Sequence, residues 1–130
     1  MRYSKGYRYM IEENFTVATP VKPEKEILTW YADLSIGGLL TVKLGFAYDG
    51  SSGPTIRTDN TMQPSAEHDV FYKFMRKKLL GLSWRPIVDK FLRTRLIEEG
   101  MCEFRADYWY KGVRIGADKA AKNPRRIYEA

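Results

Sequence analysis

The chain has one cysteine and one histidine among its 130 residues, and each shortage restricts its chemistry. Cys102 has no second cysteine with which to form an internal disulfide. Zinc sites, and dinuclear phosphohydrolases built on several histidines, lack the ligands that they need. The imidazole of His68 is therefore the single one available for acid-base chemistry.

Long apolar runs are also missing. No segment approaches the length that spans a bilayer, and the first residues lack the apolar core of a signal peptide. Phosphate-binding loops are absent, and Gly50-Ser51-Ser52-Gly53 is not a nucleophile elbow because its closing glycine comes one residue early. We expect a protein that is neither inserted in a membrane nor exported by an ordinary signal.

The composition suits one cored domain over residues 1–130 with a polar basic tail from about residue 117, since 44% of the residues are hydrophobic and 14% aromatic. The net charge is +6. Basic patches favour anionic membranes or nucleic acid, although a solvated helix face explains them equally well. Nucleic acid is weakly supported, because no arginine-rich run carries interleaved aromatics. The clusters are Lys73, Arg76, Lys77 and Lys78, and Arg93, Arg95, Lys119, Lys122, Arg125 and Arg126.

The N-terminal part has the pattern of a small antiparallel sheet. Apolar residues alternate from Tyr7 to Val17, with an irregularity near Glu12 to Asn14. Ile27 to Ser35 and Leu39 to Phe46 are predicted to form a hairpin across Gly37-Gly38. This part of the chain supplies the sheet of the fold.

The C-terminal part changes to helical spacing. One helix is predicted to open at Pro64 and Ser65, and a second to be capped by Ser83 and ended by Gly100. A third covers about Glu103 to Ile115. The predicted fold class is α+β, with a small antiparallel sheet in the N-terminal half packed on two or three helices.

The candidate chemistry centres on the first helix, where His68 and Tyr72 share a face and Asp69 points away from it. Asp89 lies beside the apolar stripe of the second helix, where a carboxylate needs a partner. If the two helices pack antiparallel, Asp89 can accept hydrogen bonds from His68 and Tyr72. The second imidazole nitrogen can then take a proton from water. Asp69 is left for a cation held by carbonyl groups of the loop from Asp49 to Gly53.

Each of these residues has a simpler structural interpretation. A lone histidine on an amphipathic helix is more often a satisfied core or boundary residue than a catalyst. Tyr72 can serve packing alone, and Asp69 can be a charge favoured at the start of a helix. The residues from Gly50 to Pro54 can be a connection that needs unusual dihedral angles.

The motifs resemble a family of tailed-phage and prophage proteins whose activity is not characterised. The family pattern is TV-x-x-GF-x-x-D-x-x-S-x-P, then HD-x-x-Y, then D-x-x-F. Thr41 to Pro54 match the first block, His68 to Tyr72 the second, and Asp89 opens the third. Val113-Arg114-Ile115-Gly116 follow in the family's order. The resemblance implies a phage or prophage origin and supplies no reaction.

A second resemblance supplies chemistry, because the same order is similar to secreted and prokaryotic phospholipases of the A-two type. It implies that His68 is the general base, Asp89 its orienting partner and Tyr72 a support for Asp89. Asp69, Asp49 and carbonyls of Gly50 and Gly53 would be ligands of calcium. This chain departs from those enzymes by its single cysteine and the absence of a signal.

Two classes of function remain open. In the first, the chain is a calcium-dependent hydrolase that acts on anionic phospholipid esters. In the second, it is a non-catalytic phage protein, either a virion component or an inhibitor of a host protein. Exposed Trp30, Trp84 and Trp109 would then form its binding surface. The expected location is the host cytoplasm, with the virion as the alternative.

Overall fold

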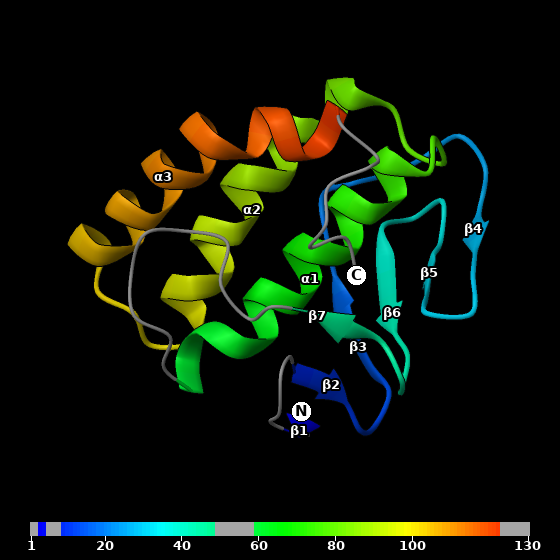
Figure 1. The fold of residues 1–130 in the computed structure, drawn as a ribbon, viewed down its shortest axis with the longest axis horizontal. Helices are drawn as coiled ribbons and strands as arrows, with labels where there is room; N and C mark the ends of the chain where they lie inside the picture. Colours follow the sequence, from blue (N-terminus) through cyan, green and yellow to red (C-terminus); the bar gives the residue numbers. More distant parts are fainter. Residues whose placement is uncertain (1–2, 5–8, 49–58, 123–130) are drawn as a thin grey trace.

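The computed structural model describes residues 3–4, 9–48 and 59–122 of the chain. Short strands from the N-terminal part lie on one side of the first long helix, and two further helices lie on its other side (Figure 1). The predicted α+β class is confirmed, with antiparallel sheet in the N-terminal half and helices after it.

The described strands form two antiparallel sheets. The first has three strands in the order β1-β2-β7, and the second has four in the order β3-β6-β5-β4. Their bounds are Tyr3–Ser4 (β1), Tyr9–Ile11 (β2), Phe15–Ala18 (β3), Ile27–Leu28 (β4), Ala32–Leu34 (β5), Leu39–Val42 (β6) and Ala47–Tyr48 (β7).

The two sheets share one interrupted ladder. Met10 pairs with Ala47 in the first sheet and Phe15 pairs with Val42 in the second, so the register is the same on both sides of the break. At the break the Gly45 amide donates to the Ile11 carbonyl at 2.7 Å. The irregularity predicted between Glu12 and Asn14 is therefore confirmed, as a bend that leaves the register unchanged.

The hairpin predicted across Gly37-Gly38 is confirmed in part. Strands β5 and β6 pair across these glycines, but the segment from Ile27 to Ser35 is two strands rather than one. The Thr29 hydroxyl accepts from the Ala32 amide at 2.9 Å, which stabilises a turn that folds β4 back on β5. The prediction of one long strand was wrong, because the turn at Thr29 interrupts a segment whose residue types favour an extended strand.

The helices are α1 (Asp59–Arg76), α2 (Arg85–Glu98) and α3 (Glu103–Lys122), with a short 3-10 turn at Leu82–Trp84 before α2. Helix α1 begins before the predicted start, so Pro64 lies inside it. Helix α3 continues past Ile115 to Lys122, which corrects the expected tail from about residue 117. Pro64 is the sixth residue of α1 and lies past its first turn, so its ring nitrogen removes one intrahelical hydrogen bond.

The ends of α2 give one correction and one confirmation. Ser83 does not cap α2. The residue that precedes the helix is Trp84, and no side chain accepts a hydrogen bond from the first amides of α2. The 3-10 turn leads directly into the helix instead. Gly100 does end it, in the left-handed conformation with a φ of +105°. The Met101 amide then returns to the Leu96 carbonyl at 2.9 Å, which satisfies an end carbonyl.

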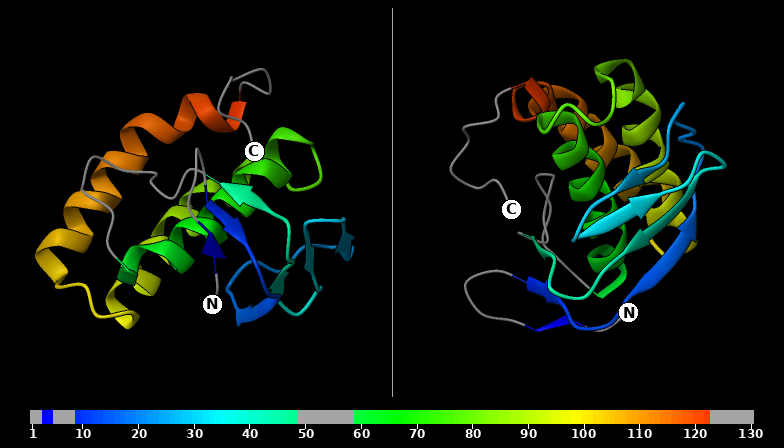
Figure 2. Two further views of the ribbon diagram at one scale, coloured as in Figure 1. Left: turned by 60° about the horizontal axis from the view of Figure 1, so that its bottom comes forward. Right: turned by 90° about the vertical axis from the view of Figure 1, so that its right-hand side faces the viewer.

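Helix α1 lies between the strands and the pair formed by α2 and α3, as two further views show (Figure 2). On one side it contributes Phe71 and Phe74 to a core shared with sheet residues such as Leu40. A second core, between α2 and α3, is built around Leu96 and Trp109. None of the described helices is both long and apolar enough to cross a membrane.

Candidate functional site

The polar residues of α1 need partners because the helix is covered on both sides. Glu67, His68 and Tyr72 are 1%, 4% and 3% exposed. Burying such groups without hydrogen bonds costs several kcal/mol, on the order of 2–7 for a neutral polar group. The partners come from α2 and α3, and they divide into two clusters.

The first cluster brings together His68, Tyr72 and Asp89. The His68 Nε2 atom lies 2.7 Å from Oδ1 of Asp89, and the Tyr72 hydroxyl donates to the same oxygen at 2.5 Å. The Asp89 side chain is fully buried. The antiparallel packing of α1 and α2 that the sequence analysis required is present, since contacts nearer the end of α1 meet residues nearer the start of α2.

Arg114 of α3 completes this cluster, and its contact with Asp89 was not anticipated. Its Nη1 atom donates to Oδ2 of Asp89 at 2.5 Å, so the carboxylate receives groups from two helices besides its own. The family pattern included Arg114 without a role. Arginine in a helix usually marks a solvated face, and helical spacing alone could not show that α3 directs this side chain at Asp89.

These contacts set the charge of the cluster. Burial would raise the pKa of the Asp89 carboxyl, but bonds and charge from His68, with bonds from Tyr72 and Arg114, outweigh it and hold the pKa below its ordinary value. Burial and the neighbouring Asp89 raise the pKa of Tyr72. Asp89 is therefore ionised and Tyr72 neutral at physiological pH.

An ionised Asp89 fixes the hydrogen on the imidazole. Asp89 can only accept, so Nε2 of His68 must donate to it, and in the neutral ring Nδ1 then carries the lone pair. The ring also packs against Tyr72, with centroids 4.4 Å apart. The arrangement can hold an oriented base whose Nδ1 atom accepts a proton.

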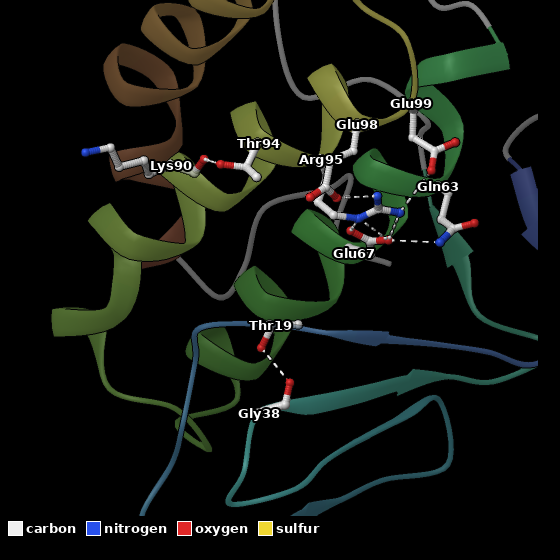
Figure 3. Close-up of polar contacts among 9 residues, drawn as sticks. All are labelled: Thr19, Gly38, Gln63, Glu67, Lys90, Thr94, Arg95, Glu98 and Glu99. Carbon is white, nitrogen blue, oxygen red and sulfur yellow. Dashed lines mark hydrogen bonds and ion pairs between the residues drawn. The ribbon is translucent and has the colours of Figure 1, made fainter.

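The second cluster is an ion pair between Glu67 and Arg95, which sequence reasoning placed only in a basic patch (Figure 3). Arg95 Nε and Nη2 donate to the Glu67 carboxylate at 3.0 to 3.3 Å, and Gln63 adds a bond at 3.2 Å. Arg95 also contacts Glu98 and Glu99 at the surface. Burial raises the pKa of Glu67, while Arg95 and Gln63 oppose the rise.

The predicted calcium ligands are divided between described and undescribed parts of the chain. Asp69 is half-buried on α1, next to His68. Asp49, Gly50 and Gly53 lie outside the described residues. Among the side chains that the structure describes, no group of three or more His, Cys, Asp or Glu residues could hold a metal ion.

Three surface expectations change. Trp109 is fully buried and Trp84 is half-buried, so of the three tryptophans expected at the surface Trp30 alone is largely exposed, at 67%. Lys73 is also buried, with its ammonium 4.7 Å from the centre of the Tyr31 ring. Lys73 and Trp109 lie on faces of α1 and α3 that neighbouring elements cover, which a single helical pattern does not reveal. Trp84 lies just before α2 and packs against the core that α1 shares with the sheet.

Two surface clefts formed by described residues lie away from His68. One lies between Thr19 and the Ile87 to Phe91 face of α2, and the other between Ile27 and Leu79. Comparison of the chain with protein-family models, with curated proteins and with solved structures finds no match. The phage and phospholipase resemblances therefore stay predictions from motifs.

Proposed function

We propose that the protein is a phage-encoded, calcium-dependent hydrolase of phospholipid esters, with His68 as general base. One observation carries the proposal: the 2.7 Å contact between His68 Nε2 and the buried carboxylate of Asp89. This contact orients the ring and directs the lone pair to Nδ1. The motif order that resembles phospholipases of the A-two type supplies the substrate class.

The reaction follows from that lone pair. Nδ1 of His68 accepts a proton from water while the water oxygen bonds to the ester carbonyl carbon. The tetrahedral intermediate collapses, the bond to the leaving alkoxide breaks, and the alkoxide takes the proton from Nδ1. The products are a fatty acid and a lysophospholipid, and His68 returns to its neutral form.

Asp89, Tyr72 and Arg114 act through His68 and are positioning residues. Tyr72 and Arg114 each donate to Asp89 at 2.5 Å, so the carboxylate charge is shared among three donors. A shared charge stabilises the imidazolium less than a lone carboxylate would. We therefore assign Asp89 the task of fixing the tautomer and angle of the ring.

Calcium, when bound, would polarise the ester carbonyl and stabilise its developing negative charge. Asp69 supplies a carboxylate next to the base along the helix, which is the ligand type that calcium prefers. Asp49 and the carbonyls of Gly50 and Gly53 are proposed as the other ligands on the sequence pattern. The net charge of +6 favours anionic phospholipid as the substrate surface.

The test is hydrolysis of anionic phospholipid vesicles in millimolar calcium by the full chain and by His68→Asn. General-base catalysis contributes on the order of 10²–10⁴ in rate, so the variant should lose at least about a hundredfold. Glu67→Gln is the matched control, since it alters the neighbouring buried residue without touching the base. Thermal unfolding of each variant establishes that it is folded at the assay temperature.

Two results would contradict the hydrolase proposal. The first is full lipolysis by folded His68→Asn, and the second is no lipolysis by the wild type at any calcium concentration tested. Calcium itself is tested by titration calorimetry on the wild type and Asp69→Asn, with magnesium as a control. We expect calcium binding that the variant loses, and no binding at millimolar calcium would remove the metal from the proposal.

A second candidate is the non-catalytic phage protein, and the burial of the cluster favours it. His68 is 4% exposed, and a carboxylate that joins α1, α2 and α3 is also a suitable structural brace. This candidate predicts that His68→Asn lowers stability while the wild type shows no lipolysis. Recovery of the protein at fixed stoichiometry in purified phage particles would support a virion component.

A further inference from the structure

The guanidinium group of Arg76 lacks an anionic partner. Arg76 lies at the end of α1 with a half-buried side chain, and its Nε atom is buried without a hydrogen-bond partner. It takes part in none of the ion pairs between described residues. Buried donors are nearly always satisfied by protein, water or a bound ion, and an unsatisfied charged donor is the most costly kind. This position therefore indicates a site for an anion.

A second arginine, Arg85, lies at the same end of the helices. Arg76 follows Tyr72 by one turn of α1, and Arg85 precedes Asp89 by one turn of α2. Tyr72 donates to Asp89 at 2.5 Å. Since the two helices are antiparallel, one further turn of each places Arg76 and Arg85 on the same side of this contact. The end of α1, the start of α2 and the last turns of α3 lie together there (Figures 1 and 2).

A third arginine, Arg114, approaches from α3. Its Nη1 atom donates to Asp89, and its side chain remains 30% exposed. A guanidinium has five N–H donors, so Arg114 retains donors beyond this bond. Burial and Asp89 raise the pKa of Tyr72, and the charges of Arg85 and Arg114 oppose that rise, which places both charges near the Tyr72 hydroxyl. Asp89 cannot also serve Arg76, because its oxygens already accept from three other side chains.

We propose that Arg76, Arg85 and Arg114, which we call the arginine cluster, bind a phosphate group at this end of the helices. A phosphate monoester carries about −1.5 to −2 charges and three acceptor oxygens, so it can accept from several guanidinium groups at once. The planar fork of arginine matches these oxygens.

The surroundings of the arginine cluster favour a strongly charged anion. The sequence from Arg76 to Val88 contains no acidic residue. The first turn of α2 also lacks one, and the dipole of this helix adds positive potential at Arg85. All three arginines are half-buried, so a ligand can reach them from solvent.

The phosphate group can belong to a soluble compound or to the headgroup of a lipid, and both sources offer the same oxygens to the arginine cluster. The binding requires neither calcium nor a proton transfer at His68. It is therefore measured in the presence of a chelator and without turnover, so that a failure of the hydrolase proposal leaves this test unaffected.

Titration calorimetry of the full chain with inorganic phosphate, at an ionic strength held constant with sodium chloride, tests the site. We expect a Kd of about 1 mM for the wild type, as suits a small ion held by a few charge-assisted bonds. Arg76→Met should weaken binding at least about tenfold. Lys90→Met is the matched control, because it removes one positive charge from an exposed position beside a different cleft. It should bind phosphate like the wild type.

A second substitution separates the hydrogen-bonding fork from its charge. Arg76→Lys keeps the charge but loses the planar donor group, so we expect affinity to fall by at least about threefold. Thermal unfolding without phosphate shows whether each variant is folded. Phosphate should raise the melting temperature of the wild type and of Lys90→Met, and it should leave that of Arg76→Met unchanged, because a ligand stabilises only a chain that binds it.

Vesicles of phosphatidylcholine with and without phosphatidate distinguish the two sources of phosphate. Binding to phosphatidate that free phosphate displaces, and that Arg76→Met loses, would support a lipid headgroup as the ligand. Phosphate binding without vesicle binding would support a soluble one. The proposal is overturned if the wild type binds no phosphate up to about 20 mM. It is also overturned if Arg76→Met binds phosphate as tightly as Lys90→Met does.

Discussion

Glu67 and His68 are consecutive residues of α1, yet they contact different turns of α2. Glu67 pairs with Arg95 near the end of α2, and His68 pairs with Asp89 near its start. The two contacts fix both the rotation of α1 and its position along α2. Apolar packing alone specifies such a register less strictly, and a polar pair left open by a slip would cost several kcal/mol, on the order of 3–5.

Replacement of Asp89 by Asn should lower the free energy of unfolding by about 3 kcal/mol. The amide keeps the shape of the carboxylate but removes the charge that His68, Tyr72 and Arg114 contact, and it leaves Arg114 without its buried counter-ion. Urea unfolding at pH 7 measures the loss. A change within about 0.5 kcal/mol, as for a surface substitution, would show that the cluster adds little to stability.

The lowered pKa of Asp89 also predicts how the free energy of unfolding changes at acid pH. A folded-state pKa below the ordinary value near 3.8 gives stability that is present above that value. The stability is lost as the pH falls through the lower folded value, because the unfolded chain then binds a proton that the folded one resists. Asp89→Asn should lose less stability than the wild type over this acid range. Urea unfolding at several pH values from 5 downward compares the two, and parallel curves would contradict the assignment.

Arg95→Met should destabilise the protein in a manner that depends on Glu67. The raised folded pKa of Glu67 favours its protonated form, so its ionisation costs stability as the pH rises. Without Arg95 that cost increases, and we expect a loss of about 3 kcal/mol at pH 7 that becomes smaller at acid pH. The double variant Glu67→Leu with Arg95→Met should recover part of the loss. An equal loss in the free energy of unfolding at pH 7 and at acid pH would exclude this mechanism.

Gly38 and Gly100 form a matched pair for backbone strain, since both have a φ near +100°. A Cβ atom at Gly38 would lie 2.4 Å from the Thr19 carbonyl oxygen, whereas at Gly100 it would meet nothing within 4 Å. Gly100→Ala should therefore cost about 1 kcal/mol, from the dihedral alone. Gly38→Ala should cost about 3 kcal/mol or more, because the clash adds to it. Equal losses in thermal unfolding would contradict the close approach at Gly38.

The single histidine allows a direct test of the tautomer. Nitrogen-15 NMR of the wild type should show a protonated Nε2 and an unprotonated Nδ1 in the neutral ring, because Nε2 donates to Asp89. No assignment by mutation is needed, since all histidine signals come from His68. Tyr72→Phe should preserve the tautomer while shifting the Nε2 signal, because Asp89 loses one competing donor. The opposite tautomer in the wild type would remove the basis of the proposed reaction.

The sequence could predict the pairing of His68 with Asp89 because each residue has a recognisable pattern in its own helix. The four-residue spacing of His68 and Tyr72 puts them on one face, and a carboxylate beside an apolar stripe requires a partner. Turn glycines and alternating strands indicated the sheet in the same way. Each of these inferences uses one segment, or two segments with one simple packing assumption.

Arg114 and the Glu67 to Arg95 pair could not be found by such reasoning. A charged residue in a helix normally lies in water, and the pattern of one helix does not show that neighbours cover it on two sides. The prediction that Trp109 is exposed was wrong for the same reason, because an aromatic residue in a polar helix does not indicate the face against which it packs. These positions depend on the arrangement of three helices, which periodicity within one helix does not report.

The place of α1 between the strands and the other helices has a consequence for the order of folding. Strands β4, β5 and β6, and helices α1, α2 and α3, each meet their neighbours in sequence, so these contacts close short loops and can form early. The pairing of β3 with β6 and of β2 with β7 closes longer loops within the sheets, and joining α1 to the sheet then brings the two halves of the chain together. We therefore expect folding to be limited by that docking, and substitutions at Phe71 or Phe74 to slow it more than equally destabilising changes between α2 and α3.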